Sequence, residues 1–195
     1  MTKAERTRRL IIEKAAPLFN TKGVAGTSLS DILEVTKLAK GSLYVHFENK
    51  EDLAHEVVDY QLARLSEVVQ ANLGRHKTAK EKLFAYLDMY LDPLNPPLVG
   101  GCPMLNFGME ADDTDEVIRK KVNALVETAQ RNIQGIVEKG IAAGEFKRDW
   151  DAQEFATRMF AVVEGGIMMA RVAGHNKAMK VIARSLKKEI EEKKA

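Results

Sequence analysis

Side chains that donate hydrogen bonds gather in one short stretch of the sequence, residues 27–53. They combine hydroxyl, ammonium, phenol and imidazole groups, and the outward positions of residues 40–46 carry no carboxylate. The donors are Thr27, Ser28, Lys37, Lys40, Ser42, Tyr44, His46 and Lys50. An exposed helix that offers donors without acids suits a groove lined with phosphates, as in double-stranded DNA. The chemistry that this stretch favours is therefore recognition of a nucleic acid.

Two short helices joined by a tight turn are expected to position these donors. Ser28 is a typical N-cap residue, and Asp31 stands where it completes a capping box. The first helix presents an apolar face of Leu29, Ile32 and Leu33. The second helix, residues 40–46, turns Leu43 and Phe47 inward, so its donors face outward.

The string AKGSLYVHFENKEDL, residues 39–53, resembles the recognition helix and the following helix start of the TetR/AcrR family of bacterial transcriptional regulators. The resemblance extends back through Phe19, Gly23 and Thr27 to Ile32. It implies a homodimer that binds an operator in double-stranded DNA and releases it when a small-molecule effector fills the C-terminal domain. It also implies a three-helix DNA-binding domain with a helix-turn-helix, then a helical effector-binding and dimerisation domain. We place these two domains at residues 1–47 and 48–195.

Two kinds of DNA contact are expected from the donors. Phosphate contacts are assigned to hydroxyls and to groups beside helix starts. These are Thr27, Ser28, Tyr44, His46 and Lys50. Lys40 and Ser42 open the recognition helix and are expected to reach base edges, while Gly41 permits close approach of the backbone. An ordinary solvated helix face is the alternative interpretation of all these residues.

Lys37 departs from the family pattern, in which the turn between the two helices usually contains glycine. A lysine at this position must adopt the dihedral angles that the turn demands. It also adds a positive charge near the backbone of the DNA, so we count Lys37 among the DNA-binding residues.

The composition is that of a soluble globular chain with an uneven distribution of charge. Hydrophobic residues make up 45% and charged residues 30% of the 195 positions, which is ordinary for this class. The first 50 residues contain nine Lys or Arg and five Asp or Glu, a balance of +4, whereas the rest has 21 and 23, a balance of −2. A basic N-terminal region on a slightly acidic body fits a nucleic-acid contact confined to one end.

Apolar residues at helical spacing predict an all-α fold with about nine helices. Thr2 and Glu5 are expected to form a capping box at the start of the first helix, and this helix is expected to stop at Gly23 in a left-handed conformation. Pro17 lies inside this helix and is expected to kink it. Further helices are expected from Asn49 through Val69, over residues 78–91 and 104–110, from a cap at Asp113 to near Gly144, over residues 150–173, and from Asn176 onward. Proline and glycine mark residues 92–103 as a loop.

The last two helices are expected to form a dimer interface. Residues 150–173 are apolar on two faces at once, and a helix buried all round needs partners on both sides. The helix from Asn176 offers one apolar stripe with lysines opposite. Together they resemble the antiparallel pair that builds the four-helix dimer interface in this family, and Gly165 and Gly166 permit close helix approach. The alternative is a core hairpin of a monomer.

A pocket for an apolar or aromatic effector is implied by the family resemblance. Adaptable methionine and aromatic side chains are candidates for its lining. The residues assigned to ligand binding are Met89, Tyr90, Cys102, Met104, Phe107, Phe160 and Val163. Plain core packing is the alternative for most of them.

Cys102 is the only cysteine, and two roles are open for it. It lies in a loop rich in glycine and proline, just before the start of a short helix. A thiol there acts as a redox or electrophile sensor if its pKa is lowered and reagents reach it. A buried cysteine that behaves as a small hydrophobic residue is the alternative, which we favour.

Other classes of protein are disfavoured. The acidic residues between Glu110 and Glu116 lack a histidine at ligand spacing, so we expect them to face a helix start and not a metal. No phosphate-binding loop, zinc motif or catalytic signature is recognisable, so we expect neither an enzyme nor a cofactor. The charged N-terminus, the single cysteine and the lack of a long uninterrupted apolar segment predict a cytoplasmic protein without a membrane span. An architectural DNA-binding protein without an effector is the main alternative function.

Overall fold

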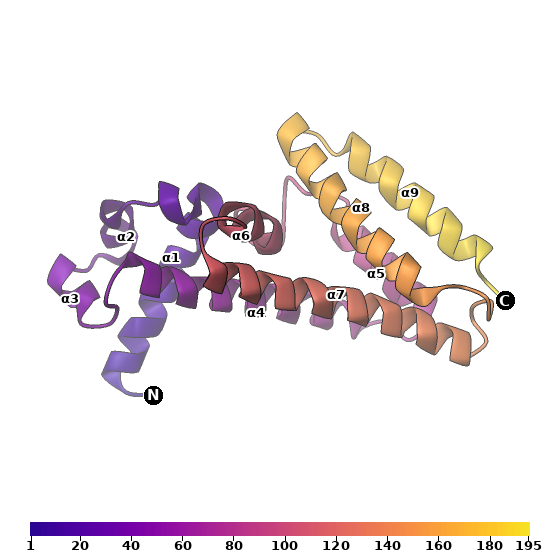
Figure 1. Ribbon diagram of the computed structural model, residues 1–195, viewed down its shortest axis with the longest axis horizontal. Coiled ribbons are helices and arrows are strands. Elements are labelled where there is room, and N and C mark those ends of the chain that lie inside the picture. The colour runs from indigo at the N-terminus through magenta and orange to yellow at the C-terminus, as the bar shows by residue number, and fades with distance from the viewer. The chain divides into compact units, whose positions relative to one another are not determined.

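The computed structural model describes residues 1–195 and is built entirely from α-helices (Figure 1). The nine helices are α1 Lys3–Gly26, α2 Leu29–Thr36, α3 Lys40–Tyr44, α4 Lys50–Leu73, α5 Ala79–Met89, α6 Pro103–Ala111, α7 Glu116–Ala142, α8 Ala152–Ala173 and α9 Lys177–Glu192. The only β-type pairing is an isolated bridge between Phe146 and Lys194. The all-α fold class and the expected number of helices are therefore confirmed.

The chain divides into two compact units. The first contains residues 1–66 and 97–124, and the second contains residues 67–96 and 125–195. Helices α4 and α7 therefore contribute one part to each unit. This division reflects which residues pack together. The boundary predicted between residues 47 and 48 instead separates a DNA-binding domain from an effector-binding domain, and it stays a prediction.

Local chemistry sets the start and the break of α1. The Thr2 hydroxyl accepts a hydrogen bond from the Glu5 amide at 3.2 Å, and the Glu5 carboxylate accepts one from the Thr2 amide at 2.7 Å. The predicted capping box is thus confirmed. Gly23 has the expected positive φ, 76° with ψ 169°, but a further helical turn to Gly26 follows it. The helical dihedrals are interrupted at Gly23 and not at Pro17, where the sequence predicts a kink.

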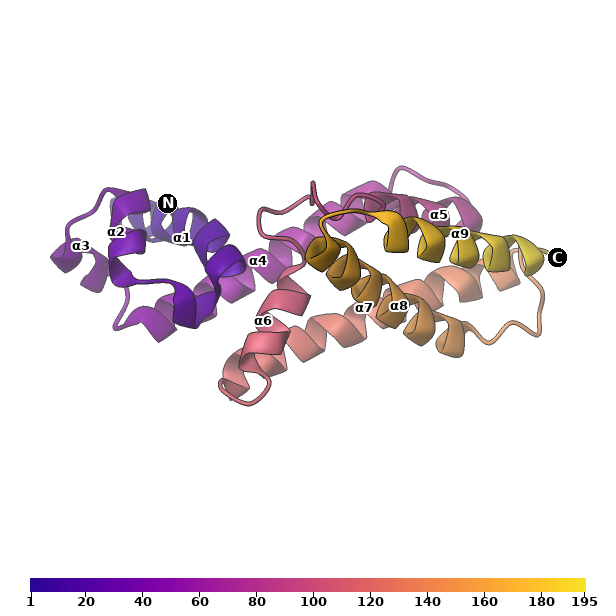
Figure 2. The same cartoon turned by 90° about the horizontal axis from the view of Figure 1, so that it is seen from above.

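An apolar core organises the first unit. Helix α1 packs against α2 and α6, and α1, α2 and α3 lie close together at the indigo end of the chain in both views (Figures 1 and 2). The buried side chains include Ile11, Ala15 and Phe19 of α1, Ile32 of α2, Leu43 of α3, Phe47 in the segment after α3, Leu53 and Val57 of α4 and Phe107 of α6. Leu43 and Phe47, which the sequence predicts to face inward, belong to this core.

The start of α7 differs from the prediction. Asp115 caps this helix, because its carboxylate accepts a hydrogen bond from the Ile118 amide at 2.9 Å. The sequence predicts Asp113 as the cap, and this is wrong. Helix α6 continues to Ala111 and a hydrogen-bonded turn follows, so α7 begins two residues later than its acidic run suggests.

In the second unit, α8 and α9 lie side by side (Figures 1 and 2). Asp151 caps α8 by accepting from the Glu154 amide at 2.9 Å. A Cβ added at Gly166 would lie 2.8 Å from side-chain atoms of Ile182 and Met179. Gly166 therefore allows close helix approach as expected, but toward α9 of the same subunit. The buried stripe of α9 contains Met179, Ala183, Leu186 and Ile190.

Candidate nucleic-acid interface

A capping box anchors α2, the first helix of the predicted pair. The Ser28 hydroxyl accepts from the Asp31 amide at 3.1 Å, and the Asp31 carboxylate accepts from the Ser28 amide at 2.9 Å, as predicted. The Lys22 ammonium, 2.8 Å away, and the amide and hydroxyl of Ser28 lower the pKa of Asp31 to about 2. Because the folded-state pKa is depressed, this stabilisation is present above about pH 4 and is lost as the pH falls toward 2.

Lys37 forms the turn between α2 and α3. Its φ of 57° and ψ of 28° place it in the left-handed region, and it is the only residue other than glycine with a positive φ. Its amide donates to the Leu33 carbonyl at 2.9 Å, which closes the end of α2. Glycine adopts this conformation without strain, which agrees with the glycine that the family resemblance leads us to expect here. The lysine side chain itself is exposed.

Helix α3 exposes the face on which the sequence places the base-reading residues. Leu43 is buried, and Lys40, Gly41 and Tyr44 are exposed, with 46% of Tyr44 accessible. A Cβ at Gly41 would meet no atom within 4 Å, so the backbone is open to a partner at this point. Ser42 and His46 are half-buried. The helix ends at Tyr44, two residues before the predicted end, and residues 45 and 46 form a hydrogen-bonded turn.

Arg8 fastens the end of this segment to its neighbours. Its guanidinium donates to the His46 carbonyl and, at 2.6 Å, to the Glu56 carboxylate. The same group lies 4.4 Å from the centre of the Phe47 ring, within the range of a cation–π contact. Sequence reasoning misses Arg8, because its partners are 38 and 48 residues away and no local spacing connects them.

Thr27 and Lys50 hold the last turn of α1 and the residue that follows it. The side chain of Thr27 is fully buried, and its hydroxyl donates to the Gly23 carbonyl at 2.6 Å. The Lys50 ammonium donates to the carbonyls of Val24 at 2.9 Å and Thr27 at 3.2 Å. Burial conflicts with the phosphate contact predicted for Thr27, and the contact predicted for Lys50 competes with these two hydrogen bonds. The sequence does not reveal the burial of Thr27 or the internal hydrogen bonds of Lys50, because both residues lie beside helix starts, where hydroxyl and ammonium groups are usually exposed.

The comparisons with known proteins agree with this geometry. Residues 11–57 match the family model of bacterial regulatory proteins of the tetR family, and residues 79–186 match that of the tetracyclin repressor-like C-terminal domain. The chain belongs to the TetR family. Transcription regulation and DNA binding are the activities of this family, so α2 and α3 form the helix-turn-helix of a DNA-binding transcriptional regulator.

Individual relatives of this TetR-family protein match between 83% and 100% of its length. A TetR-family transcriptional regulator from Cytophaga hutchinsonii is 40% identical, with a TM-score of 0.93 over 100% of this chain and 98% of the other. The HTH-type transcriptional regulator TtgR of Pseudomonas putida is 30% identical over 83% of this chain and 79% of its own length. The HTH-type transcriptional repressor DhaR of a Mycobacterium species is 25% identical over 85% and 82%.

The residues predicted to bind an effector are divided between the two units of this TetR-family protein. Cys102, Met104 and Phe107 are buried in the first unit. Tyr90, Phe160 and Val163 are buried and Met89 is half-buried in the second unit. Their assignment to one effector pocket stays a prediction.

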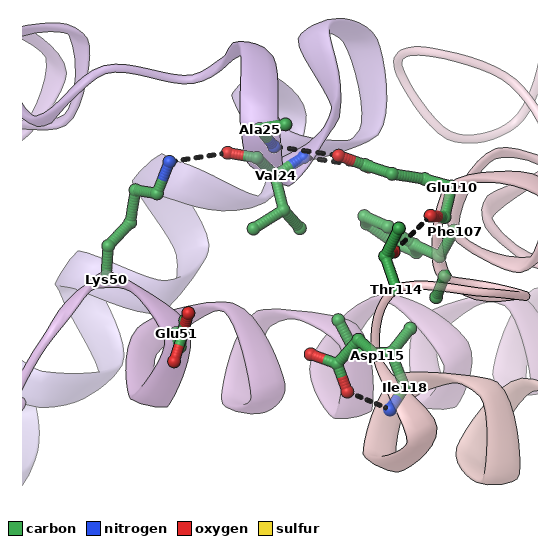
Figure 3. Close-up of a pocket in the computed structure, with 10 residues that line it drawn as sticks. Val24, Ala25, Lys50, Glu51, Phe107, Glu110, Thr114, Asp115 and Ile118 are labelled. Atoms are coloured by element: carbon green, nitrogen blue, oxygen red, sulfur yellow. Dashed lines mark hydrogen bonds between the residues drawn. The ribbon is translucent and has the colours of Figure 1, made fainter.

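A pocket of about 210 Å³ lies within the first unit (Figure 3). Its lining includes the apolar side chains of Phe107, Ala111 and Ile118 and the charged side chains of Lys50 and Glu110. Phe107 is the only predicted ligand-binding residue in its lining.

None of the nine helices is both long and apolar enough to cross a membrane.

Proposed function

We propose that this protein is a homodimeric transcriptional repressor that binds a nearly palindromic operator and releases it when a small molecule binds. The observation that carries the DNA-binding part is the exposed face of α3, where Lys40, Gly41 and Tyr44 are open to a partner while Leu43 anchors the helix. Lys40 and Ser42 read bases, and Ser28, Tyr44 and His46 contact phosphates. Repression is supported by the relative DhaR, which is named a transcriptional repressor.

The homodimer forms through α8 and α9. An apolar stripe of α8 faces outward, with Met168, Met169 and Val172 exposed by 46%, 51% and 82%. Gly165 lies on the same side of the helix and has open space around it, and α9 exposes Val181. An apolar face of this kind, repeated in a second copy, is self-complementary about a two-fold axis. Each subunit then supplies one recognition helix, and the two lie about 34–36 Å apart in successive major grooves.

The effector is an apolar or aromatic small molecule that fills the C-terminal part of the subunit. It favours a conformer with a different separation of the two recognition helices, and the affinity for the operator falls accordingly. Support comes from the buried aromatic side chains of Tyr90 and Phe160, which both lie in the second unit. As a repressor of bacterial genes, the protein acts in the cytoplasm, where the DNA is.

Sequencing of the DNA that the purified protein selects from a random pool tests the proposal. We expect a near-palindrome whose half-sites lie about one helical turn apart. Lys40→Ala and Ser42→Ala should change the selected bases at a cost of about 1–3 kcal/mol, whereas Tyr44→Phe should weaken binding to all sequences. A flat preference with a steep dependence on salt would identify an architectural DNA-binding protein instead. Equal losses by all three variants on operator and random DNA would overturn the assignment of base readers.

A further inference from the structure

The last turn of α1 and the residue that follows it are held from both sides by charged side chains of other helices (Figure 3). Glu110, near the end of α6, accepts hydrogen bonds from the amides of Val24 at 2.8 Å and Ala25 at 2.7 Å. Lys50, at the start of α4, donates to the carbonyls of Val24 and Thr27. We call residues 23–27 with these two side chains the Glu110–Lys50 clamp.

The clamp depends on the break in α1 at Gly23. Because Gly23 leaves the helical dihedrals, the turn that follows starts with amides that need acceptors from elsewhere. The Glu110 carboxylate supplies them, and it approaches so closely that a Cβ on Gly23 would lie 2.8 Å from its Oε2 atom. The positive φ of 76° independently favours glycine at this position. Backbone conformation, close approach and hydrogen bonding therefore agree on one arrangement.

We propose that Glu110 is a positioning residue for DNA binding. Together with Lys50 it fixes residues 23–27, and this segment leads directly into Ser28, the N-cap of α2. If α2 is not fixed in the free protein, it must become ordered when DNA binds. The apparent affinity for DNA is then the intrinsic affinity multiplied by the fraction of molecules in the binding-competent conformation. The proposal rests on the DNA-binding function and adds a residue of α6 that touches no DNA.

The same geometry engages two of the three ammonium donors of Lys50 in the clamp, so we expect this contact to compete with a phosphate and to prevail over it. Its ammonium is directed at two carbonyls of the segment that it holds. Lys50→Met should therefore weaken operator binding without changing how affinity depends on salt. A phosphate ligand would instead reduce the slope of log affinity against log salt concentration by about 0.9.

The test compares Glu110→Ala and Glu110→Gln with Asp113→Asn. Asp113 is exposed and lies three residues further along, so this control removes a similar charge outside the clamp. Affinity for the DNA that the wild type selects is measured at several salt concentrations, well below the melting temperature of every variant. Amide hydrogen exchange of residues 23–36 is measured in the free protein.

We expect Glu110→Ala, which removes both hydrogen bonds from the amides of Val24 and Ala25, to bind about tenfold more weakly, with an unchanged salt slope. Exchange at Val24 and Ala25 should become faster. Glu110→Gln keeps one acceptor oxygen and should give an intermediate affinity, and it provides the test if the alanine variant fails to fold. Asp113→Asn should resemble the wild type.

Wild-type affinity and exchange in the Glu110 variants, or an equal loss in Asp113→Asn, would overturn the proposal. A wild-type protein that binds no DNA would instead refute the proposed function. In that case unchanged exchange in Glu110→Ala would still disprove the clamp.

Discussion

Lys37 occupies the turn between α2 and α3 with φ 57° and ψ 28°, where a lysine is strained and a glycine is not. The left-handed conformation costs a residue with a Cβ about 1–2 kcal/mol. A glycine removes this cost, but it also gives the unfolded chain more conformational freedom, which offsets part of the stabilisation. We predict that Lys37→Gly raises the free energy of unfolding by about 0.5–1 kcal/mol. Chemical denaturation measures it, and Lys37→Ala is the control, since it removes the same charge and keeps the strain. A glycine variant no more stable than the alanine variant would show that the turn is relaxed.

Cys102 is buried, with 6% of its surface exposed, at the N-cap position of α6. Burial favours the structural role over the sensor, because a reagent must first reach the thiol. We predict that the folded protein resists thiol reagents near pH 7 until it is denatured, and that Cys102→Ser lowers stability by about 1–3 kcal/mol through burial of a hydroxyl. The measurement pairs labelling rates in native and denatured protein with operator binding. Fast native labelling with loss of DNA binding, absent in Cys102→Ser, would establish a redox or electrophile switch.

Residues whose role is local were accessible from the sequence, and residues whose role is tertiary were not. The capping boxes at Thr2 and Ser28 join residues three apart, so a pattern of types reveals them. Arg8 and Glu110 act on backbone groups 38 and about 86 residues away, and no spacing in one sequence encodes such a pairing. Thr27 shows the converse, because its type suits a phosphate contact while packing has buried it.

At the scale of elements, α3 is too short to hold itself in place. It has five residues, Lys40–Tyr44, and isolated helices of this length are unstable in water. Its position must come from tertiary contacts, namely the buried Leu43 and the attachment of the following turn by Arg8. The recognition helix therefore depends on α1 and α4 as much as on its own sequence.

We predict that Arg8→Met weakens binding to operator DNA by about tenfold, as for one lost charged hydrogen bond, without changing the salt slope. The reason is that the Arg8 guanidinium is engaged by the His46 carbonyl and the Glu56 carboxylate. Arg9→Met is the matched control, since Arg9 loses the same charge but is exposed and pairs only with Glu13 within α1. Affinities on selected DNA over a range of salt decide the matter. A slope reduced by about 0.9 in Arg8→Met alone would make Arg8 a phosphate ligand.

Element boundaries show where periodicity stops being informative. All nine helices were expected from the sequence, the longer ones because a buried stripe recurs whatever the ends do and α3 because its residues resemble a recognition helix. The ends of a helix depend on which of several possible residues caps it. Asp115 and not Asp113 caps α7, because α6 extends to Ala111. The break at Gly23 could be predicted from the glycine itself. The helical turn that follows the break could not, because its amides donate hydrogen bonds to Glu110, which is distant in the sequence.

At the scale of the whole molecule, the donors predicted to bind DNA and the exposed stripe of α8 belong to different units. Dimerisation can therefore be altered by mutation without touching the helix-turn-helix.

The two glycines of α8 have different surroundings. Gly166 packs against Ile182 and Met179 of α9, whereas Gly165 has no atom within 4 Å of an added Cβ. A large side chain at Gly166 should disturb the subunit itself, at a cost of about 1–3 kcal/mol from overpacking, before it affects a second copy.

We predict that Met169→Glu yields a folded monomer. Met169 is 51% exposed in the apolar stripe of α8, and a two-fold interface would bring two such carboxylates together out of water. Operator affinity should then fall steeply, because each half-site is bound separately and the gain from linked binding is lost. Sedimentation velocity with circular dichroism reports the mass and the fold. Val117→Glu is the control, since Val117 is similarly exposed, at 46%, but lies on α7. An intact dimer with normal operator affinity in Met169→Glu would remove this face of α8 from the interface.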